Sequence, residues 1–346
     1  MHQGLVPGTQ VRDRYEVLGL IGQGGMGAVY KAADSRLPGR LCAIKEIWPP
    51  PGLSDEALRQ ARDQFLREAS TLARLDHPNL PKVSDYFTLD PPSSGSHYAD
   101  GWTLFSTSRD YLVMDYVPGQ DLHQMAQQAH REGQFLAERE VLDWMSQLCD
   151  ALSYLHSQDP PVLHRDVKPG NVKLTPDGRI KLVDFGLVKP LDPEDPKTLT
   201  GLRGIGSLPY TPIEQYGGEL GHSSTYSDLY SLGATLYHLL TGRPPASAQD
   251  RFLEPEALVP PRQVNPAISP AVERAILAAL ALHPSERPES VAVWSKMLLG
   301  DAPTIPIRVR PKDMGWGQAL RENRWLLLLA LAVTAAAVLV TFNQSL

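Results

Sequence analysis

A group of polar residues between positions 164 and 186 has the types and spacing needed to bind a metal ion and accept a proton. The segment His164–Asn171 is followed by Asp184-Phe185-Gly186, and the turn sequence Thr175-Pro176-Asp177-Gly178 lies between them. A hairpin about that turn would bring Asn171 opposite Val183, next to Asp184. An amide oxygen and a carboxylate would then converge, which suits a hard cation such as magnesium. The alternative, an acidic turn beside an ordinary hairpin, does not account for the joint spacing.

Asp166 precedes this predicted metal site by a few residues, and its carboxylate could accept a proton from an incoming hydroxyl group. A second feature is the glycine-rich segment Gly22–Gly27, which fits the spacing G-x-G-x-x-G. Glycines let backbone N–H groups approach phosphate oxygens without interference from a Cβ atom. Any glycine-rich hairpin could match this pattern. A dinucleotide-binding loop is disfavoured, because a strand rather than a helix is expected after the glycines.

Lys45 and Glu68 form a third candidate pair. Lys45 ends the apolar segment Leu41–Ile44, and Glu68 follows Phe65 by three residues on the apolar face of a predicted helix. A charge that faces the core needs a partner, so we predict an ion pair between Glu68 and Lys45. The alternative is that they are two unrelated surface charges.

The elements that would position these candidates are predicted to be mainly strands in the first third of the chain and mainly helices in the rest. Residues 15–47 contain short apolar runs separated by glycines, and Ser54 can cap the helix that carries Glu68. The segment Asp228–Leu240 is apolar on nearly every side, which places a helix there in the middle of a domain. Further elements are expected as strands at 162–164, 171–174 and 179–183 and as helices at 270–281 and 289–299.

Taken together, these motifs resemble the protein kinase signature set, and the bacterial serine/threonine kinases most of all. The resemblance covers about Tyr15 to Leu299. It implies an α+β fold of two lobes, with a strand-rich N-lobe at 15–116, after an N-terminal tail at 1–14, and a helical C-lobe at 117–300. It also implies transfer of the γ-phosphoryl group of ATP to Ser or Thr of protein substrates, with magnesium, or manganese in its place, as the metal.

The same resemblance assigns roles to individual residues. Asp166 would be the catalytic base, Lys168 would steady the γ-phosphate, and Lys45, paired with Glu68, would hold the α- and β-phosphates. Asn171 and Asp184 would bind the metal ions. Residues implied in ATP binding, including gatekeeper Met114 and the hinge 115–117, are Ile21, Gly22, Gln23, Gly24, Gly25, Met26, Gly27, Val29, Ala43, Lys45, Met114, Asp115, Tyr116 and Val117. Structural roles fall to Asp228 and to an ion pair between Glu214 and Arg287.

In the kinases that this chain resembles, an arginine directly before the catalytic aspartate pairs with a phosphate on the activation loop, so Arg165 implies regulation by phosphorylation of the following loop. Thr198 and Thr200 are the candidate sites, and autophosphorylation would bring two copies of the chain together. Ser207 occupies the place of the usual substrate-side Thr, and Pro212-Ile213-Glu214 replaces the usual Ala-Pro-Glu.

Two other classes of function stay open. A pseudokinase scaffold would bind ATP without turnover, but it usually lacks the lysine, the catalytic aspartate or the metal-binding aspartate, and this chain has all three. A small-molecule phosphotransferase is disfavoured by the intact segment from Asp184 to Glu214. The net charge of −6 gives no support for a nucleic-acid partner. The two cysteines, Cys42 and Cys149, lie in apolar segments and are expected to be buried thiols.

The C-terminal region predicts a membrane anchor. Residues 325–342 carry no charge and span about 27 Å as a helix, just enough for a bilayer core. The alternative is a buried C-terminal helix. The linker 301–324 has a surplus of basic residues, whereas the short tail 343–346 has no charged side chain. Because Lys and Arg favour the cytoplasmic side, we expect a single-pass protein of the cell membrane whose kinase domain is cytoplasmic and whose tail is external.

Overall fold

A computed structural model describes residues 4–24, 27–48, 54–89, 108–185, 205–216 and 223–300. The chain divides into two units, Met1–Thr304 and Ile305–Leu346, and all described residues belong to the first. Thr198, Thr200, the linker 301–324, the apolar run 325–342 and the tail 343–346 therefore lie outside the described residues. Among the described residues, no helix has both the length and the apolar character needed to cross a bilayer.

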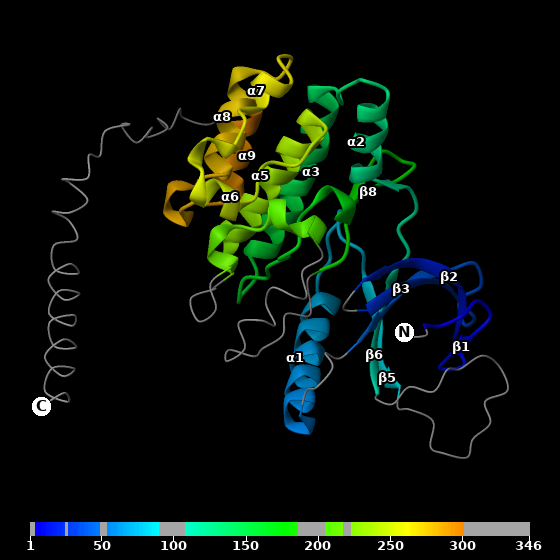
Figure 1. Ribbon diagram of the computed structural model, residues 1–346. Coiled ribbons are helices and arrows are strands. Elements are labelled where there is room, and N and C mark those ends of the chain that lie inside the picture. Colours follow the sequence, from blue (N-terminus) through cyan, green and yellow to red (C-terminus); the bar gives the residue numbers. More distant parts are fainter. Residues whose placement is uncertain are drawn as a thin grey trace, which may run out of the picture. The chain divides into compact units, whose positions relative to one another are not determined.

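An antiparallel sheet forms the N-terminal lobe (Figure 1). Its six strands, in spatial order, are β1 (Gln10–Val11), β2 (Tyr15–Gly24), β3 (Gly27–Asp34), β4 (Leu41–Ile47), β6 (Arg109–Asp115) and β5 (Val83–Leu89). The helix α1 (Asp55–Ala73) begins directly after Ser54, as expected, and contacts β5. The expected strand-rich first third is thus confirmed.

Strands β4 and β6 of this sheet each contribute side chains to two separate cores, because successive side chains point to opposite faces. On β4, Ile44 joins one core with Tyr30 and Tyr111, while Ala43 joins the other with Leu112 on β6. The expected N-terminal tail differs in part from the structure. Gln10 and Val11 pair with β2, and Leu5 is buried in the first core, because that face of the sheet needs apolar cover.

Helices make up most of the C-terminal lobe (Figure 1). The helix α5 (Thr225–Thr241) is buried along nearly its whole length, as its apolar sequence predicts, and it contacts α2, α3, α7 and α8. The described α-helices of this lobe, besides α5, are α2 (Leu122–Arg131), α3 (Glu138–His156), α6 (Ala248–Leu253), α7 (Pro261–Val264), α8 (Pro270–Ala279) and α9 (Val291–Leu299). Cys149 on α3 and Cys42 on β4 are both buried free thiols, as expected.

A second, smaller sheet contains the hairpin that connects Asn171 to Asp184, the two predicted metal ligands. Its strands are β7 (Gln120–Asp121), β8 (Val172–Leu174) and β9 (Ile180–Leu182). The predicted turn closes the β8–β9 hairpin, with Gly178 in the left-handed region at φ +80°. The strand expected at 162–164 is absent, since the backbone N–H of His164 donates to the side chain of Asp228 rather than to a neighbouring strand.

Candidate active site

The Asp166 carboxylate lies at the centre of a small hydrogen-bonded group. The Lys168 ammonium donates to Asp166 Oδ2 at 2.7 Å, and the Asn171 amide nitrogen donates to the same oxygen at 2.8 Å. Asn171 also donates to the Asp166 backbone oxygen, because the short 3-10 helix Pro169–Asn171 turns its side chain back toward the loop. Asp166 is thus oriented by two donors, as a base that must meet a substrate hydroxyl requires.

The hairpin places Asp184 beside this group, as the turn sequence predicts. The Val183 N–H donates to the Asn171 carbonyl oxygen at 2.8 Å, which fixes the start of β8 against the residue before Asp184. Asp184 has a left-handed backbone (φ 59°), an uncommon conformation for any residue other than glycine. Uncommon backbone conformations cluster at functional sites, where the surrounding structure supports them.

Asp228 fixes the backbone of the loop just before Asp166. Its carboxylate accepts hydrogen bonds from the backbone N–H groups of His164 and Arg165, at 2.9 and 2.8 Å, and from His156 Nε2 at 2.9 Å. Burial alone would raise the pKa of Asp228, but the hydrogen bond and charge of His156 and the nearby His164 hold it below its ordinary value. The predicted structural role of Asp228 matches this geometry, whereas His156 was not singled out by the sequence.

The glycine-rich segment forms the β2–β3 hairpin. Gly22 lies opposite Val29 and Gly24 opposite Gly27, while Gly25 and Met26 are outside the described residues. Gly27 is required sterically, because its backbone is left-handed and a Cβ atom there would overlap the carbonyl oxygen of Glu46. Ile21 and Gln23 lie on the same strand β2.

Strands β3, β4 and β6 bring the other predicted ATP-binding residues together. Val29 lies opposite Lys45, and Ala43 lies opposite Met114. The following hinge is tied to both neighbouring segments: Arg40 donates to the Asp115 carboxylate at 3.3 Å, and the Lys82 N–H donates to its other oxygen at 3.2 Å. The Lys31 ammonium lies 4.7 Å from the centre of the Tyr116 ring, and Val117 is buried.

The predicted ion pair between Lys45 and Glu68 is wrong for this structure. The Lys45 ammonium donates instead to the Phe185 carbonyl oxygen at 3.2 Å and to Asp184 Oδ1 at 3.4 Å. Glu68 Oε1 accepts hydrogen bonds from Arg165 at 3.4 Å and from Gln64 at 3.2 Å. The apolar face of α1 does turn Glu68 inward, as expected, but the helix pattern does not specify which cation the carboxylate meets.

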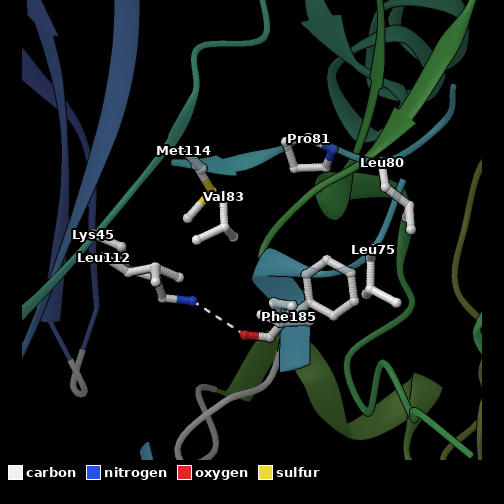
Figure 2. A pocket seen from close by; sticks show the side chains of 9 residues that line it. Lys45, Leu75, Leu80, Pro81, Val83, Leu112, Met114 and Phe185 are labelled. Carbon is white, nitrogen blue, oxygen red and sulfur yellow. Dashed lines mark hydrogen bonds between the residues drawn. The ribbon is translucent and has the colours of Figure 1, made fainter. Parts of the chain in front are cut away.

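An apolar pocket lies beside Lys45 and Phe185. Figure 2 shows the Phe185 ring facing this pocket, and the dashed line joins the Lys45 ammonium to the Phe185 carbonyl oxygen. The pocket is lined by Lys45, Leu72, Leu75, Leu80, Pro81, Val83, Leu112, Met114 and Phe185. Its lining therefore includes a residue of α1, the predicted gatekeeper Met114, and Phe185, which follows the predicted metal ligand Asp184.

The residues present fit a magnesium ion held mainly by its substrate. No three His, Cys, Asp or Glu side chains gather as a metal site in the part of the chain that the structure describes. The amide nitrogen of Asn171 is committed to Asp166, which leaves its oxygen as the group that can face a cation. Asp184 supplies a second oxygen ligand, and its side chain is 41% exposed. Magnesium commonly binds to one or two protein ligands and completes its shell with phosphates and water.

The ion pair predicted between Glu214 and Arg287 is present in the C-terminal lobe. Ser227 Oγ donates to the same carboxylate at 3.0 Å. Glu214 belongs to the 3-10 helix Ile213–Gln215, at the end of the segment that follows the candidate site. Ser207 lies in the 3-10 helix Ile205–Tyr210.

Gln64 and the contact of Arg165 with Glu68 were missed by the sequence reasoning. Gln64 stands four residues before Glu68, a spacing at which helical side chains meet, so this bond could have been predicted. The contact with Arg165 joins residues 97 positions apart, and no local spacing signals it.

Comparisons with known proteins show which proteins this chain resembles. The family model described as the protein kinase domain matches residues 15–295. The chain is 34% identical over 245 residues to serine/threonine-protein kinase B of Synechocystis sp., covering 68% of this chain and 38% of that protein. It is 34% identical over 283 residues to serine/threonine-protein kinase PknA of Mycobacterium tuberculosis, covering 81% and 59% respectively. The chain thus spans about two fifths of the first of these curated relatives and about three fifths of the second.

Solved structures show the same likeness. A structure titled PpkA-294 apo form has a TM-score of 0.65 and 27% identity, covering 85% of this chain and 99% of that one. The PknI kinase domain of Mycobacterium tuberculosis has a TM-score of 0.61 and 27% identity, covering 86% and 100%.

Proposed function

Because this chain belongs to the protein kinase domain family, as a member of its bacterial serine/threonine type, we propose that it transfers the γ-phosphoryl group of ATP to Ser or Thr of protein substrates. The observation that carries this proposal is the orientation of Asp166 by Lys168 and Asn171, with Asp184 brought alongside by the hairpin. A pseudokinase scaffold would not need such a group, and no residue of it is missing.

In the proposed reaction, the substrate hydroxyl oxygen forms a bond to the γ-phosphorus while the bond to the bridging oxygen of ADP breaks. Asp166 accepts the hydroxyl proton, and Lys168, 2.7 Å from Asp166, offers its positive charge to the transferred phosphoryl group. Magnesium, when bound by Asn171 and Asp184, neutralises charge on the phosphate oxygens. The protein thus contributes mainly by positioning the reacting groups and by neutralising the charge of the phosphates.

The nucleotide would lie beneath the β2–β3 hairpin, with adenine against the hinge 115–117. Val29 lies opposite Lys45, and Ala43 lies opposite Met114. The apolar side chains proposed to cover the adenine and the lysine proposed to contact the phosphates therefore come from the same part of the sheet. Lys45 would hold the α- and β-phosphates. Its ammonium lies 3.4 Å from the carboxylate of Asp184, the proposed metal ligand, which supports this placement.

We further propose that the chain is activated by autophosphorylation of Thr198 or Thr200 between two copies, and that it acts in membrane-linked signalling. Arg165 supports the first point, since it directly precedes Asp166 and its side chain is 30% exposed. The apolar run 325–342 and the basic linker before it support an anchor in the cell membrane with the kinase domain in the cytoplasm.

Incubation of the full chain in detergent with radiolabelled ATP and a mixture of protein substrates tests the activity. We expect Ser and Thr labelling by the wild-type protein and loss of nearly all of it in Asp166→Asn. Asp177→Asn changes an exposed aspartate of the hairpin turn and serves as the control. Labelling by Asp166→Asn at the wild-type rate would show that Asp166 is not the base.

A further inference from the structure

Glu46, the residue after Lys45 on β4, holds a buried carboxylate on the face of the sheet away from Lys45, because successive side chains of a strand alternate. Its side chain is fully buried, and Arg109 Nη1 lies 2.6 Å from Glu46 Oε1. The hydroxyl groups of Tyr111 and Tyr30 donate to Glu46 Oε1 and Oε2 respectively, each at 2.9 Å. Three donors therefore hold one buried charge directly next in the chain to the proposed phosphate contact.

The bonds of Glu46 reach both strands that flank β4. Tyr111 on β6 lies directly opposite Glu46, whereas Tyr30 on β3 lies opposite Ile44 and so reaches Glu46 diagonally. Side-chain bonds to both neighbouring strands fix the register of β4 between them. A slip of β4 by one residue would turn the side chain of Lys45 to the other face of the sheet.

The polar group around Glu46 lies in an otherwise apolar core, where apolar side chains would serve stability as well. A buried ion pair commonly contributes no more to stability than well-packed apolar residues of similar volume. Burial and the charge of Glu46 raise the pKa of both Tyr30 and Tyr111, so both hydroxyl groups stay protonated and act as donors. The value of this group is therefore expected to lie in the geometry that it imposes on β4.

Lys45 itself has little support on its own side of the sheet. Among the described residues, its ammonium donates to the Phe185 carbonyl oxygen at 3.2 Å and to Asp184 Oδ1 at 3.4 Å. The expected ion pair with Glu68 is not formed, since Glu68 Oε1 accepts from Arg165 and Gln64. The position of the Lys45 ammonium therefore depends mainly on the position of β4.

The N-terminal segment closes the group around Glu46. The Leu5 N–H donates to the Tyr30 hydroxyl oxygen at 3.0 Å, so this hydroxyl is an acceptor as well as a donor. A Cβ atom on Gly4 would overlap the same oxygen, so only glycine permits this approach. Both residues precede the family match, which begins at Tyr15. The group therefore extends to a part of the chain outside the matched domain.

From these contacts we infer that Glu46 is a positioning residue for Lys45, and that Tyr30, with Gly4 and Leu5 seated on it, belongs to the same support. The consequence for nucleotide binding rests on the proposed function, since a phosphate contact is the role proposed for Lys45. The position of the Lys45 ammonium can nevertheless be measured without nucleotide and without phosphoryl transfer.

Carbodiimide cross-linking of the full chain in detergent, without nucleotide, measures that position. The reagent couples a carboxylate to an amine in direct contact, so Lys45 and Asp184, 3.4 Å apart, should form a cross-link that mass spectrometry quantifies. The exposed pair Lys82 and Asp76, 3.9 Å apart, is the internal reference. The measured quantity is the ratio of the first cross-link to the second.

Two variants weaken the support and keep the aromatic rings in place. Tyr30→Phe removes the donor to Glu46 Oε2 and the acceptor of the Leu5 N–H. Tyr111→Phe removes one of the two donors to Oε1. Neither residue belongs to the proposed active site. The matched control is Tyr15→Phe, which removes a buried hydroxyl of the same core that donates to Asp85 instead of Glu46.

We expect the cross-link ratio to fall about twofold to tenfold in Tyr111→Phe, because one lost hydrogen bond shifts a two-state equilibrium by about that factor. The ratio should fall further in Tyr30→Phe, which loses the contact with Leu5 as well. Tyr15→Phe should match the wild type. Wild-type ratios in both Tyr30→Phe and Tyr111→Phe would overturn the inference.

Nucleotide affinity gives a second readout, which a merely structural role would not move. Adenosine has the base and ribose of ATP but no phosphates, so a displaced Lys45 should weaken the binding of ATP and leave that of adenosine unchanged. Calorimetric titration of the full chain in detergent should show the ratio of the two dissociation constants changing about twofold to tenfold in Tyr30→Phe. Combined with Lys45→Met, Tyr30→Phe should change this ratio no further than Lys45→Met does alone.

The two readouts separate a failure of this inference from a failure of the proposed function. Equal weakening of ATP and adenosine binding in Tyr30→Phe would mean a general loss of structure and would overturn the positioning role. If Lys45→Met alone binds ATP as the wild type does, the proposed phosphate contact is wrong, and the cross-link ratio still decides whether Glu46 positions Lys45.

Discussion

The Arg287 guanidinium binds the Glu214 carboxylate through two parallel hydrogen bonds, Nη1 to Oε1 at 2.7 Å and Nη2 to Oε2 at 2.9 Å. The Arg287 side chain is fully buried, and the Glu214 side chain is 14% exposed. Arg287 also donates to three backbone carbonyl oxygens, those of Tyr226, Ala281 and Leu282. This pair therefore connects the segment after the active site to the helices of the C-terminal lobe.

We expect Arg287→Gln to lower the free energy of unfolding by about 3–5 kcal/mol, since it leaves the Glu214 charge largely buried without its partner. Urea denaturation of the full chain in detergent measures the change. Arg179→Gln, which breaks an ion pair whose two side chains are both 65% exposed, is the control and should cost less than about 1 kcal/mol. Similar losses in the two variants would mean that the buried pair has no special role in stability.

His238 predicts a loss of stability in mild acid. Burial, with a smaller contribution from the nearby His123, lowers the pKa of His238 to about 4. The unfolded chain binds this proton near the ordinary pKa of about 6.5, so the stabilisation is complete above that pH and is lost as the pH falls toward 4.

For His238, the expected loss between pH 7 and pH 4 is about 3 kcal/mol in the free energy of unfolding, from a pKa difference of about 2.5 units. Urea denaturation across this range should show the slope in the wild type and a shallower slope in His238→Gln. His283→Gln changes an exposed histidine and is the control. If His238→Gln keeps the full wild-type slope, another group carries the effect.

Phosphorylation of Thr198 or Thr200 should activate the kinase. We expect prior incubation with magnesium and ATP to add phosphate at one of these positions, detected by mass spectrometry. The Thr198→Ala, Thr200→Ala double variant should then be less active by about fivefold or more, the usual scale of coupling between two sites. Thr71→Ala, on the exposed side of α1, is the control. Full activity of the double variant would contradict activation at these threonines.

The apolar run should bind the chain to the membrane. A fluorescent protein fused to the N-terminus should lie at the membrane and should disperse when residues 325–346 are deleted. Val333→Arg places a charge at the centre of the run, at a cost of about 2.5–3.5 kcal/mol for insertion, and should also release the protein. Gln344→Arg places the same charge beyond the run and should not. Recovery of the intact protein in the soluble fraction without detergent would exclude an anchor.

The sequence by itself predicted the features that depend on local spacing. The turn at 175–178 fixes the hairpin, so the approach of Asn171 to Val183 followed from the residues between them. The inward, partly buried position of Glu68 followed from the helix period, and the burial of α5 followed from its composition. The roles of Asp228 and of the Glu214–Arg287 pair came from family resemblance, and the structure agrees with both.

Only the tertiary structure decided which cation Glu68 binds. Lys45 lies on β4 of the N-terminal lobe and Arg165 lies in the loop before Asp166, and α1, which contacts β5, is positioned so that Glu68 Oε1 is 3.4 Å from Arg165. That position depends on packing among residues far apart in the chain, which no motif encodes. The pairing of Gln10 and Val11 with β2 has a similar cause, since an edge strand forms where a sheet offers free hydrogen-bonding groups and an apolar face to cover.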